Sequence, residues 1–200
     1  MNIKYFSFII ALSLFVFSCK ESPKEEVKEE KKAIPQGQVQ ADISIFQDSA
    51  SFAWKNMTEA DDQKIAFTKR LLDEISYMPK YDIMKHTKLM EMCKALKAKR
   101  YSEEGILVSA SIDQYDASTD SLLSAVKVFV VATPNVENYP LVNDLLKDIT
   151  ALENDVVTHR VVYDSWVQRY NQLLDEQKDA LASFGEPYAS LKKKGMFQLE

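Results

Sequence analysis

The chain contains few residues of the kinds that form turns, disulfides or catalytic centres. Its 200 residues include only four Gly, six Pro, two Cys and two His. Because β-turns depend on glycine and proline, their scarcity disfavours many short strands and favours a few long helices. The sequence also lacks GxSxG, HExxH and glycine-rich phosphate-loop motifs, which mark common enzyme classes. We therefore expect no enzymatic activity, no cofactor and no metal site.

The charge balance argues against a nucleic-acid partner. The chain has 25 basic and 30 acidic residues, which give a net charge of −5. Domains that bind nucleic acid usually present an excess of positive charge to the phosphates. With 46% hydrophobic residues, the composition is otherwise that of an ordinary globular protein.

Residues 1–18 have the pattern of a bacterial lipoprotein signal peptide. Lys4 precedes an apolar stretch from Tyr5 to Phe17, which is shorter than the ~20 residues of a transmembrane helix but suits a secretory signal. The stretch ends in Val16-Phe17-Ser18-Cys19, an ending that resembles the lipobox. This resemblance implies cleavage before Cys19 and attachment of acyl chains such as palmitate to Cys19, which together anchor a protein stably.

Residues 19–40 are predicted to be the lipidated cysteine followed by a flexible, disordered tether. The stretch KESPKEEVKEEKK, residues 20–32, has no Phe, Leu or Ile, so it cannot bury enough apolar area to offset the entropy of ordering. A Lys/Glu-rich tract directly after the cysteine resembles the export tags of some surface lipoproteins. The alternative is a spacer that carries no sorting signal. We expect a lipid-anchored protein of the cell envelope, at the outer membrane, with surface exposure left open.

Residues 41–200 carry the periodicity of a helical bundle. Between Pro140 and Gly185, apolar and aromatic residues repeat in heptads, which predicts one long helix packed lengthwise as in a coiled coil. The fold class is therefore predicted to be all-α, an antiparallel up-and-down bundle of about four long helices. The seam comprises Val142, Leu145, Ile149, Leu152, Val156, His159, Tyr163, Trp166, Tyr170 and Leu173.

The two helical stretches before that seam are less sharply defined. Residues 42–75 predict either one helix broken near Asp61 and Asp62 or two helices. Pro79 predicts either a kink or a fresh start, followed by a helix that is rich in lysine between Lys80 and Arg100. This basic face either meets anionic lipid or acidic polymer, or balances acidic neighbours within the bundle.

The stretch from Gly105 to Thr133 is ambiguous because it is rich in β-branched residues. We predict helix there from the bundle context, with strand as the alternative. One helix, or two shorter helices with a break at Asp116 and Ser118, are both left open for this stretch.

The region from residue 137 to residue 171 resembles the C-terminal signature of the LemA family, and the closing LKKKGMFQLE is similar to that family's last segment. The resemblance implies an α-helical bundle that faces the outside of a membrane. It also implies that the matching residues determine the fold and do not catalyse a reaction. They are Glu137, Asn138, Tyr139, Pro140, Glu153, Arg160, Tyr163, Tyr170 and Asn171.

Two functions follow as expectations. The first is a LemA-like lipoprotein that acts as an envelope scaffold or interaction module, held to the membrane by acyl chains on Cys19 and bound to an unidentified envelope protein. The alternative is a lipoprotein that binds a small molecule or polymer in an interhelical pocket near Trp54, Tyr163 and Trp166. A pocket with unfilled aromatic side chains would favour the second, and a close-packed bundle with an exposed apolar patch would favour the first.

Overall fold

The computed structural model describes residues 35–107 and 109–197, which are mostly helical and, within these ranges, contain no strand. The predicted signal peptide, Cys19 and most of the predicted tether lie outside the described residues. The predicted all-α class is confirmed. The helices are α1 (Gln36–Ser76), α2 (Ile83–Lys99), α3 (Ser109–Ala132), α4 (Pro140–Glu176) and the short α5 (Lys178–Phe184), with 3-10 turns η1 (Glu104–Leu107), η2 (Val136–Asn138) and η3 (Tyr188–Ser190).

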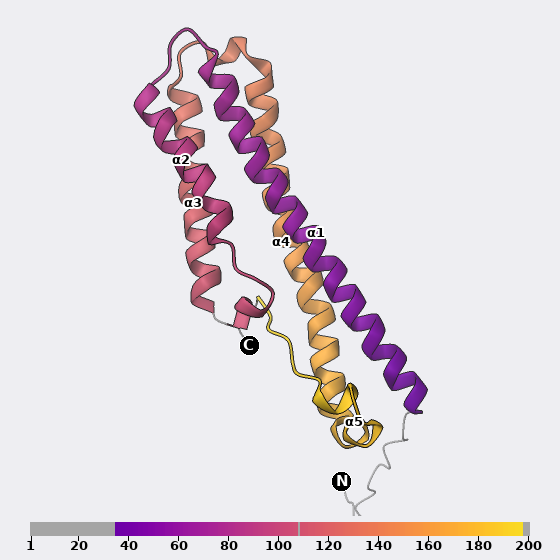
Figure 1. The fold of residues 1–200 in the computed structure, drawn as a ribbon. Helices are drawn as coiled ribbons and strands as arrows, with labels where there is room; N and C mark the ends of the chain where they lie inside the picture. The colour runs from indigo at the N-terminus through magenta and orange to yellow at the C-terminus, as the bar shows by residue number, and fades with distance from the viewer. Residues whose placement is uncertain (1–34, 108, 198–200) are drawn as a thin grey trace, which may run out of the picture. The chain divides into compact units, whose positions relative to one another are not determined.

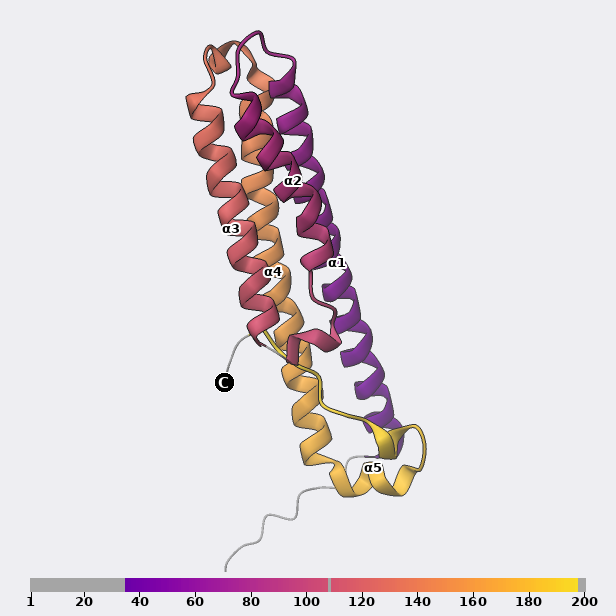
Figure 2. The same cartoon turned by 60° about the vertical axis from the view of Figure 1, so that its left-hand side comes forward.

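The long helices α1 to α4 run alternately up and down, as predicted (Figure 1). Figures 1 and 2 show α1 and α4 side by side along most of their length, whereas the shorter α2 and α3 lie beside only one half of that pair. Asp82 caps α2 by accepting a hydrogen bond from the backbone N–H of Lys85 at 3.0 Å. Of the two alternatives predicted at Pro79, the fresh start is therefore present.

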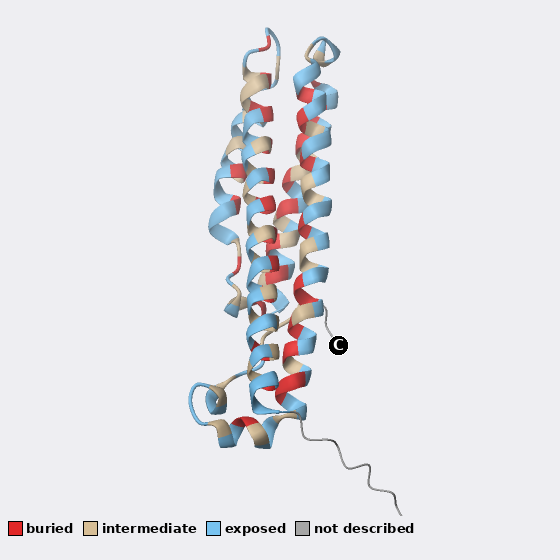
Figure 3. Cartoon of the chain, turned by 90° about the vertical axis from the view of Figure 1, so that its right-hand side faces the viewer, coloured by how far each residue is buried: buried red, intermediate tan, exposed pale blue. Residues whose placement is uncertain are grey.

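The core lies where the four long helices face one another (Figure 3). Seven residues of the predicted seam on α4 are buried, whereas Leu152, His159 and Trp166 are half-buried. This pattern confirms the heptad interpretation for the buried face of α4. The buried seam residues are Val142, Leu145, Ile149, Val156, Tyr163, Tyr170 and Leu173.

The break predicted near Asp61 and Asp62 is wrong, because α1 continues through both residues. Asp61 points into the core, where it pairs with Lys64 of the same helix and with Arg100 after α2, and accepts a hydrogen bond from Tyr115 of α3. The helix also begins earlier than predicted, so residues 36–40, placed above in the tether, are helical. Val39 is fully buried there, in a second apolar cluster that includes Ile43 and Tyr170.

Two further expectations need correction. The helix from Pro140 ends at Glu176 and not near Gly185, because the chain turns at Gln177 into α5 and buries Leu181 against the second cluster. In the region of residues 105–133, α3 is one helix, so both the strand alternative and the alternative of two shorter helices are wrong. Asp116 does not interrupt α3, because its carboxylate pairs with Arg160 on α4.

Candidate functional site

The first four LemA-like residues form the turn that starts α4. Glu137 and Asn138 lie in η2, and the backbone N–H of Tyr139 donates to Val136 at 3.0 Å. Pro140 occupies the first turn of the helix, where its missing N–H leaves no intrahelical hydrogen bond unmade. These residues therefore set where α4 begins.

Glu153 belongs to a buried ion cluster, which we define as Asp61, Lys64, Arg100 and Glu153. The Lys64 ammonium group is 2% exposed and lies 2.9 Å from Asp61 and 2.7 Å from Glu153. Arg100 approaches the other oxygen of Asp61 at 3.0 Å. The Tyr115 hydroxyl also donates to Asp61. The cluster ties α1 to α3, to α4 and to the residue that follows α2.

Arg160 joins α4 to α3 through a bidentate ion pair with Asp116. Its two terminal nitrogens donate to the two carboxylate oxygens of Asp116, each at 2.7 Å, and one of them also donates to the Tyr101 hydroxyl at 2.6 Å. Burial is the largest single influence and works against the charge of Arg160, but the hydrogen bonds and electrostatic attraction from Asp116 and Tyr101 together outweigh it and raise the pKa of the guanidinium. Arg160 is therefore a fixed cation.

An aromatic cage lies beside Arg160, and we define it as Trp54, Tyr101 and Tyr163. The ring of Trp54 is 5.6 Å from that of Tyr163 and 6.1 Å from that of Tyr101. The ring of Phe197 fills the cage: it stacks on Trp54 at 6.0 Å and meets both tyrosines edge to face. The Arg160 guanidinium covers the same ring at 5.0 Å.

The cage brings together two of the three aromatic residues of the predicted interhelical pocket. Trp54 and Tyr163 are in contact, whereas Trp166 packs against Phe46 and Arg169 instead. Burial raises the pKa of Tyr101 to about 12, although the positive charge of Arg160 lowers it. Burial, reinforced by the Glu103 carboxylate, also raises the pKa of Tyr163. Both phenols are therefore neutral at ordinary pH: the Tyr101 hydroxyl accepts a hydrogen bond from Arg160, and the Tyr163 hydroxyl donates one to Glu103.

The segment that carries Phe197 is held by polar contacts from α4 and from Glu103. Asn171 forms two hydrogen bonds of 2.9 Å with the backbone of Lys194, one to its N–H and one to its carbonyl. Asp164 accepts a hydrogen bond from the backbone N–H of Phe197 at 2.9 Å. Thus three of the LemA-like residues, Arg160, Tyr163 and Asn171, contact this segment. Tyr170, in contrast, accepts a hydrogen bond from Gln47 of α1.

Gly195 allows this segment to approach η1 closely. A Cβ atom at Gly195 would lie 3.0 Å from a side-chain carbon of Ile106 and 3.1 Å from the backbone nitrogen of Leu107. We expect Gly195→Val to loosen the segment and to lower the free energy of unfolding by about 1–3 kcal/mol, measured by urea denaturation. Gly37→Ala is the control, because a Cβ there meets nothing within 4 Å. Equal effects of the two substitutions would contradict the close packing.

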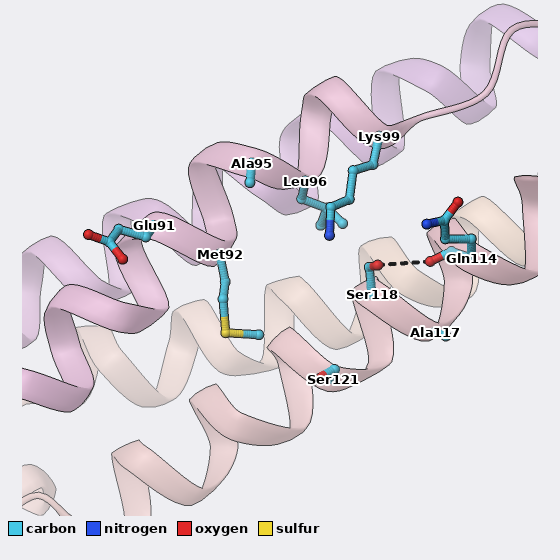
Figure 4. A pocket seen from close by; sticks show the side chains of 9 residues that line it. All are labelled: Glu91, Met92, Ala95, Leu96, Lys99, Gln114, Ala117, Ser118 and Ser121. Atoms are coloured by element: carbon cyan, nitrogen blue, oxygen red, sulfur yellow. Dashed lines mark hydrogen bonds between the residues drawn. The ribbon is translucent and has the colours of Figure 1, made fainter.

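A second candidate site is the groove between α2 and α3 (Figure 4). It consists of two adjoining hollows of about 590 and 580 Å³ that share Met92 and Ser121. Figure 4 shows the Met92 side chain reaching from α2 toward α3. The floor includes Leu89 and Phe129, and the exposed Val128, at 69%, lies along it. Its charged lining residues are Lys85, Lys88, Lys99 and Glu91.

Sequence reasoning named Glu153, Trp54 and Tyr163 but missed their partners, which are Asp61, Lys64 and Arg100 in the buried ion cluster and Tyr101 and Phe197 at the cage. Asp61 and Lys64 occupy positions on the buried stripe of α1, between Met57 and Leu71. A charged residue at a stripe position is the sequence signal that would have marked them. Phe197 carried no such signal, because its segment has no helical or strand periodicity.

Within residues 35–107 and 109–197, no group of three His, Cys, Asp or Glu side chains has an arrangement that could hold a metal ion. In the same part of the chain, no helix is both long enough and apolar enough to span a bilayer. Comparisons of the chain with family models, with curated proteins and with solved structures find no match.

Proposed function

We propose that the chain is a LemA-like lipoprotein, anchored to the cell envelope through Cys19, that acts as a non-enzymatic scaffold or interaction module. The observation that carries this proposal is the open, largely apolar groove between α2 and α3, whose two hollows are each larger than the hollow of about 260 Å³ between α1 and α2. The aromatic cage does not offer an empty pocket, because Phe197 fills it. An exposed apolar surface on a packed domain is typical of protein interaction sites.

The charge around the groove indicates the chemistry of the partner. Lys85, Lys88 and Lys99 border it, against Glu91 as its one acidic lining residue. A helix with a narrow apolar face would bury that face on Leu89 and Phe129. Carboxylates beside the face would meet the lysines and favour the encounter. We therefore propose an envelope protein with an acidic amphipathic helix as the partner.

The contacts of the LemA-like residues support a structural role for them. Glu153 pairs with Lys64 of α1, and Arg160 pairs with Asp116 of α3. Tyr163 is fully buried and donates a hydrogen bond to Glu103. Each residue thus joins α4 to another element. This is what determinants of a bundle fold would do, and it supports the proposal that the family likeness concerns the fold.

Crosslinking from the groove tests the interaction proposal. A photoreactive residue at Ser121, within the groove, is expected to form a discrete protein adduct on membranes, and one at the exposed Val161 of α4 is not. Ala125→Glu should abolish the Ser121 adduct, because it adds a negative charge to the apolar floor where an acidic partner docks. Adducts of equal yield from Ser121 and Val161, or none from Ser121, would contradict the groove as the docking site.

The second candidate function is binding of an acidic polymer or small molecule in the same groove. Its two hollows have volumes in the range of about 300–1,000 Å³ that ligand sites occupy. The lysines at its edge favour an anionic ligand. In that case an acidic polysaccharide added to the purified protein would bind with an affinity that Lys88→Glu lowers, without any protein adduct at Ser121.

A further inference from the structure

Residues 191–197 form a docked segment that differs from the rest of the described domain. The segment contains no helix or strand, and its residues are half-buried or exposed. Figures 1 and 2 show it as the yellow trace that leaves the α5 end and runs beside α4 toward η1. It is therefore laid onto a surface that the helices form, and it does not interrupt any of them.

The surface under the segment binds its backbone in a way that is specific for an extended chain. The amide of Asn171 pairs with both the N–H and the carbonyl of Lys194, as a neighbouring strand would. Three residues further on, Asp164 accepts the N–H of Phe197. Asn171 and Asp164 both belong to α4, so one helix sets the register of the segment.

The same surface also contacts two side chains of the segment, those of Lys194 and Phe197, and leaves no room for a side chain at Gly195. The Lys194 ammonium group lies 2.6 Å from a carboxylate oxygen of Glu103. Gly195 passes η1 where a Cβ would be too close to Leu107. The ring of Phe197 enters the aromatic cage under Arg160. Together these contacts select the sequence Lys-Gly-X-Phe, in which X is Met196, a half-buried residue that also packs against the apolar core.

The binding surface is held in shape by contacts that do not involve the segment. Trp54 touches Tyr163 directly, and Tyr101 packs edge to face on Tyr115 at 5.6 Å. The bonds from Arg160 to Asp116 fix the cation over the cage. Because these residues belong to the bundle, the segment can leave without breaking a backbone hydrogen bond of α1 to α4.

We propose that this surface is a peptide-binding site for a Lys-Gly-X-Phe segment, which the chain's own residues 191–197 occupy and which the same segment of a second copy can occupy instead. The inference goes beyond the proposed function and does not rest on it. Preformed contacts lower the cost of binding, since only the peptide has to be ordered. In one chain, the linkage gives the segment an effective concentration of roughly millimolar, so a free peptide competes poorly until the linked segment is weakened.

The test uses the full chain and a fluorescent peptide with the sequence of residues 191–197. The chain with Phe197→Ala is expected to bind this peptide saturably, because its own segment no longer fills the cage. The wild-type chain is expected to bind at least about tenfold more weakly, because its linked segment competes. A peptide with Phe197→Ala should bind the variant chain about tenfold more weakly than the unaltered peptide does.

The matched control is the chain with Phe184→Ala, which removes a half-buried ring that packs on Tyr188 outside the cage. It should bind the peptide no better than the wild type. The proposal is overturned if the Phe197→Ala chain keeps its helical circular dichroism and does not bind the peptide, or if binding does not depend on the phenylalanine of the peptide.

Hydrogen exchange in the wild-type chain keeps the proposal testable should Phe197→Ala unfold the domain. The backbone N–H groups of Lys194 and Phe197 donate hydrogen bonds to the side chains of Asn171 and Asp164. Because the segment opens by itself, we expect these two N–H groups to exchange at least about tenfold faster than the buried amides of α4. Exchange of these two amides only together with those of α4 would show that the segment is an integral part of the core, and would overturn the proposal.

Discussion

Replacement of Lys64 by methionine is expected to lower the free energy of unfolding by roughly 3 kcal/mol, because it leaves two carboxylates without their shared cation. Lys64 is 2% exposed and lies within 3 Å of Asp61 and Glu153. Methionine has a similar length and is apolar, so packing changes little. Most of the lost stability comes from Asp61, because its side chain is only 3% exposed and water cannot compensate its charge. The Glu153 side chain is 34% exposed and is partly solvated. Urea denaturation followed by circular dichroism measures the effect.

The control for this substitution is Lys69→Met on the same helix. Lys69 also pairs with a carboxylate, that of Asp73 at 2.7 Å, but its side chain is 53% exposed. An exposed pair contributes little because solvent screens it, so the control should leave the free energy of unfolding nearly unchanged. The combination of Lys64→Met with Glu153→Gln should cost less than the sum of the two single changes, because the partners are coupled. Similar costs for Lys64→Met and Lys69→Met would show that the buried ion cluster does not stabilise the bundle.

The domain is also expected to lose stability steeply between pH 10 and pH 12. Burial raises the pKa of Tyr101 from 10.0 to about 12 and raises those of Tyr115, Tyr163 and Tyr170 as well. In the unfolded chain these phenols ionise near pH 10, so above that pH the unfolded state releases protons that the folded state keeps. Their contribution to stability is present in full below pH 10 and declines as the pH rises toward the folded pKa. Between the unfolded pKa near 10 and its folded pKa of about 12, Tyr101 alone contributes a slope of about 1.4 kcal/mol per pH unit.

Urea denaturation at a series of pH values measures this decline, and phenol absorbance near 295 nm shows when the tyrosines ionise. The loss of helical signal should coincide with the ionisation of the buried phenols. Tyr101→Phe should reduce the slope by about 1.4 kcal/mol per pH unit. Tyr77→Phe, at a residue that is 77% exposed, should leave it unchanged. A free energy of unfolding that stays constant from pH 10 to pH 12 would contradict the burial of these hydroxyl groups.

The fold class could be predicted because it depends on local pattern. The scarcity of Gly and Pro and the heptads from Val142 to Leu173 are visible along the chain, and they correspond to the buried face of α4. The end of that helix was missed because the periodicity continues into α5. There the chain turns at Gln177 to bury Leu181 against Val39, a residue distant in the sequence.

The candidate sites were harder to predict because they depend on contacts between distant residues. Asp61 is a poor helix former by itself, and only its pairing with Arg100 and Lys64 explains why α1 continues through it. The aromatic cage likewise assembles Trp54, Tyr101 and Tyr163 from three separate parts of the chain. Periodicity indicates which residues face the core, but it does not indicate which of them meet there.

The described domain and the predicted anchor together suggest how such a module would work at a membrane. The residues that join α4 to its neighbours, among them Arg160 and Glu153, hold the four long helices in register. A bundle held in this way presents the α2–α3 groove as a preformed surface. Binding of a partner therefore loses little conformational entropy from ordering of the groove itself. An acylated Cys19 would confine that surface to the envelope and raise the local concentration of partners there.

Intact mass and membrane fractionation of the native protein beside a Cys19→Ala variant test the central claim most directly. We predict that the native chain lacks residues 1–18, carries the added mass of acyl chains and sediments with the membrane. The variant should keep residues 1–18 or lose them without gaining lipid, and the variant chain without residues 1–18 should be released from the membrane. Native and variant chains of equal lipid content and equal distribution would contradict a lipid-anchored envelope module.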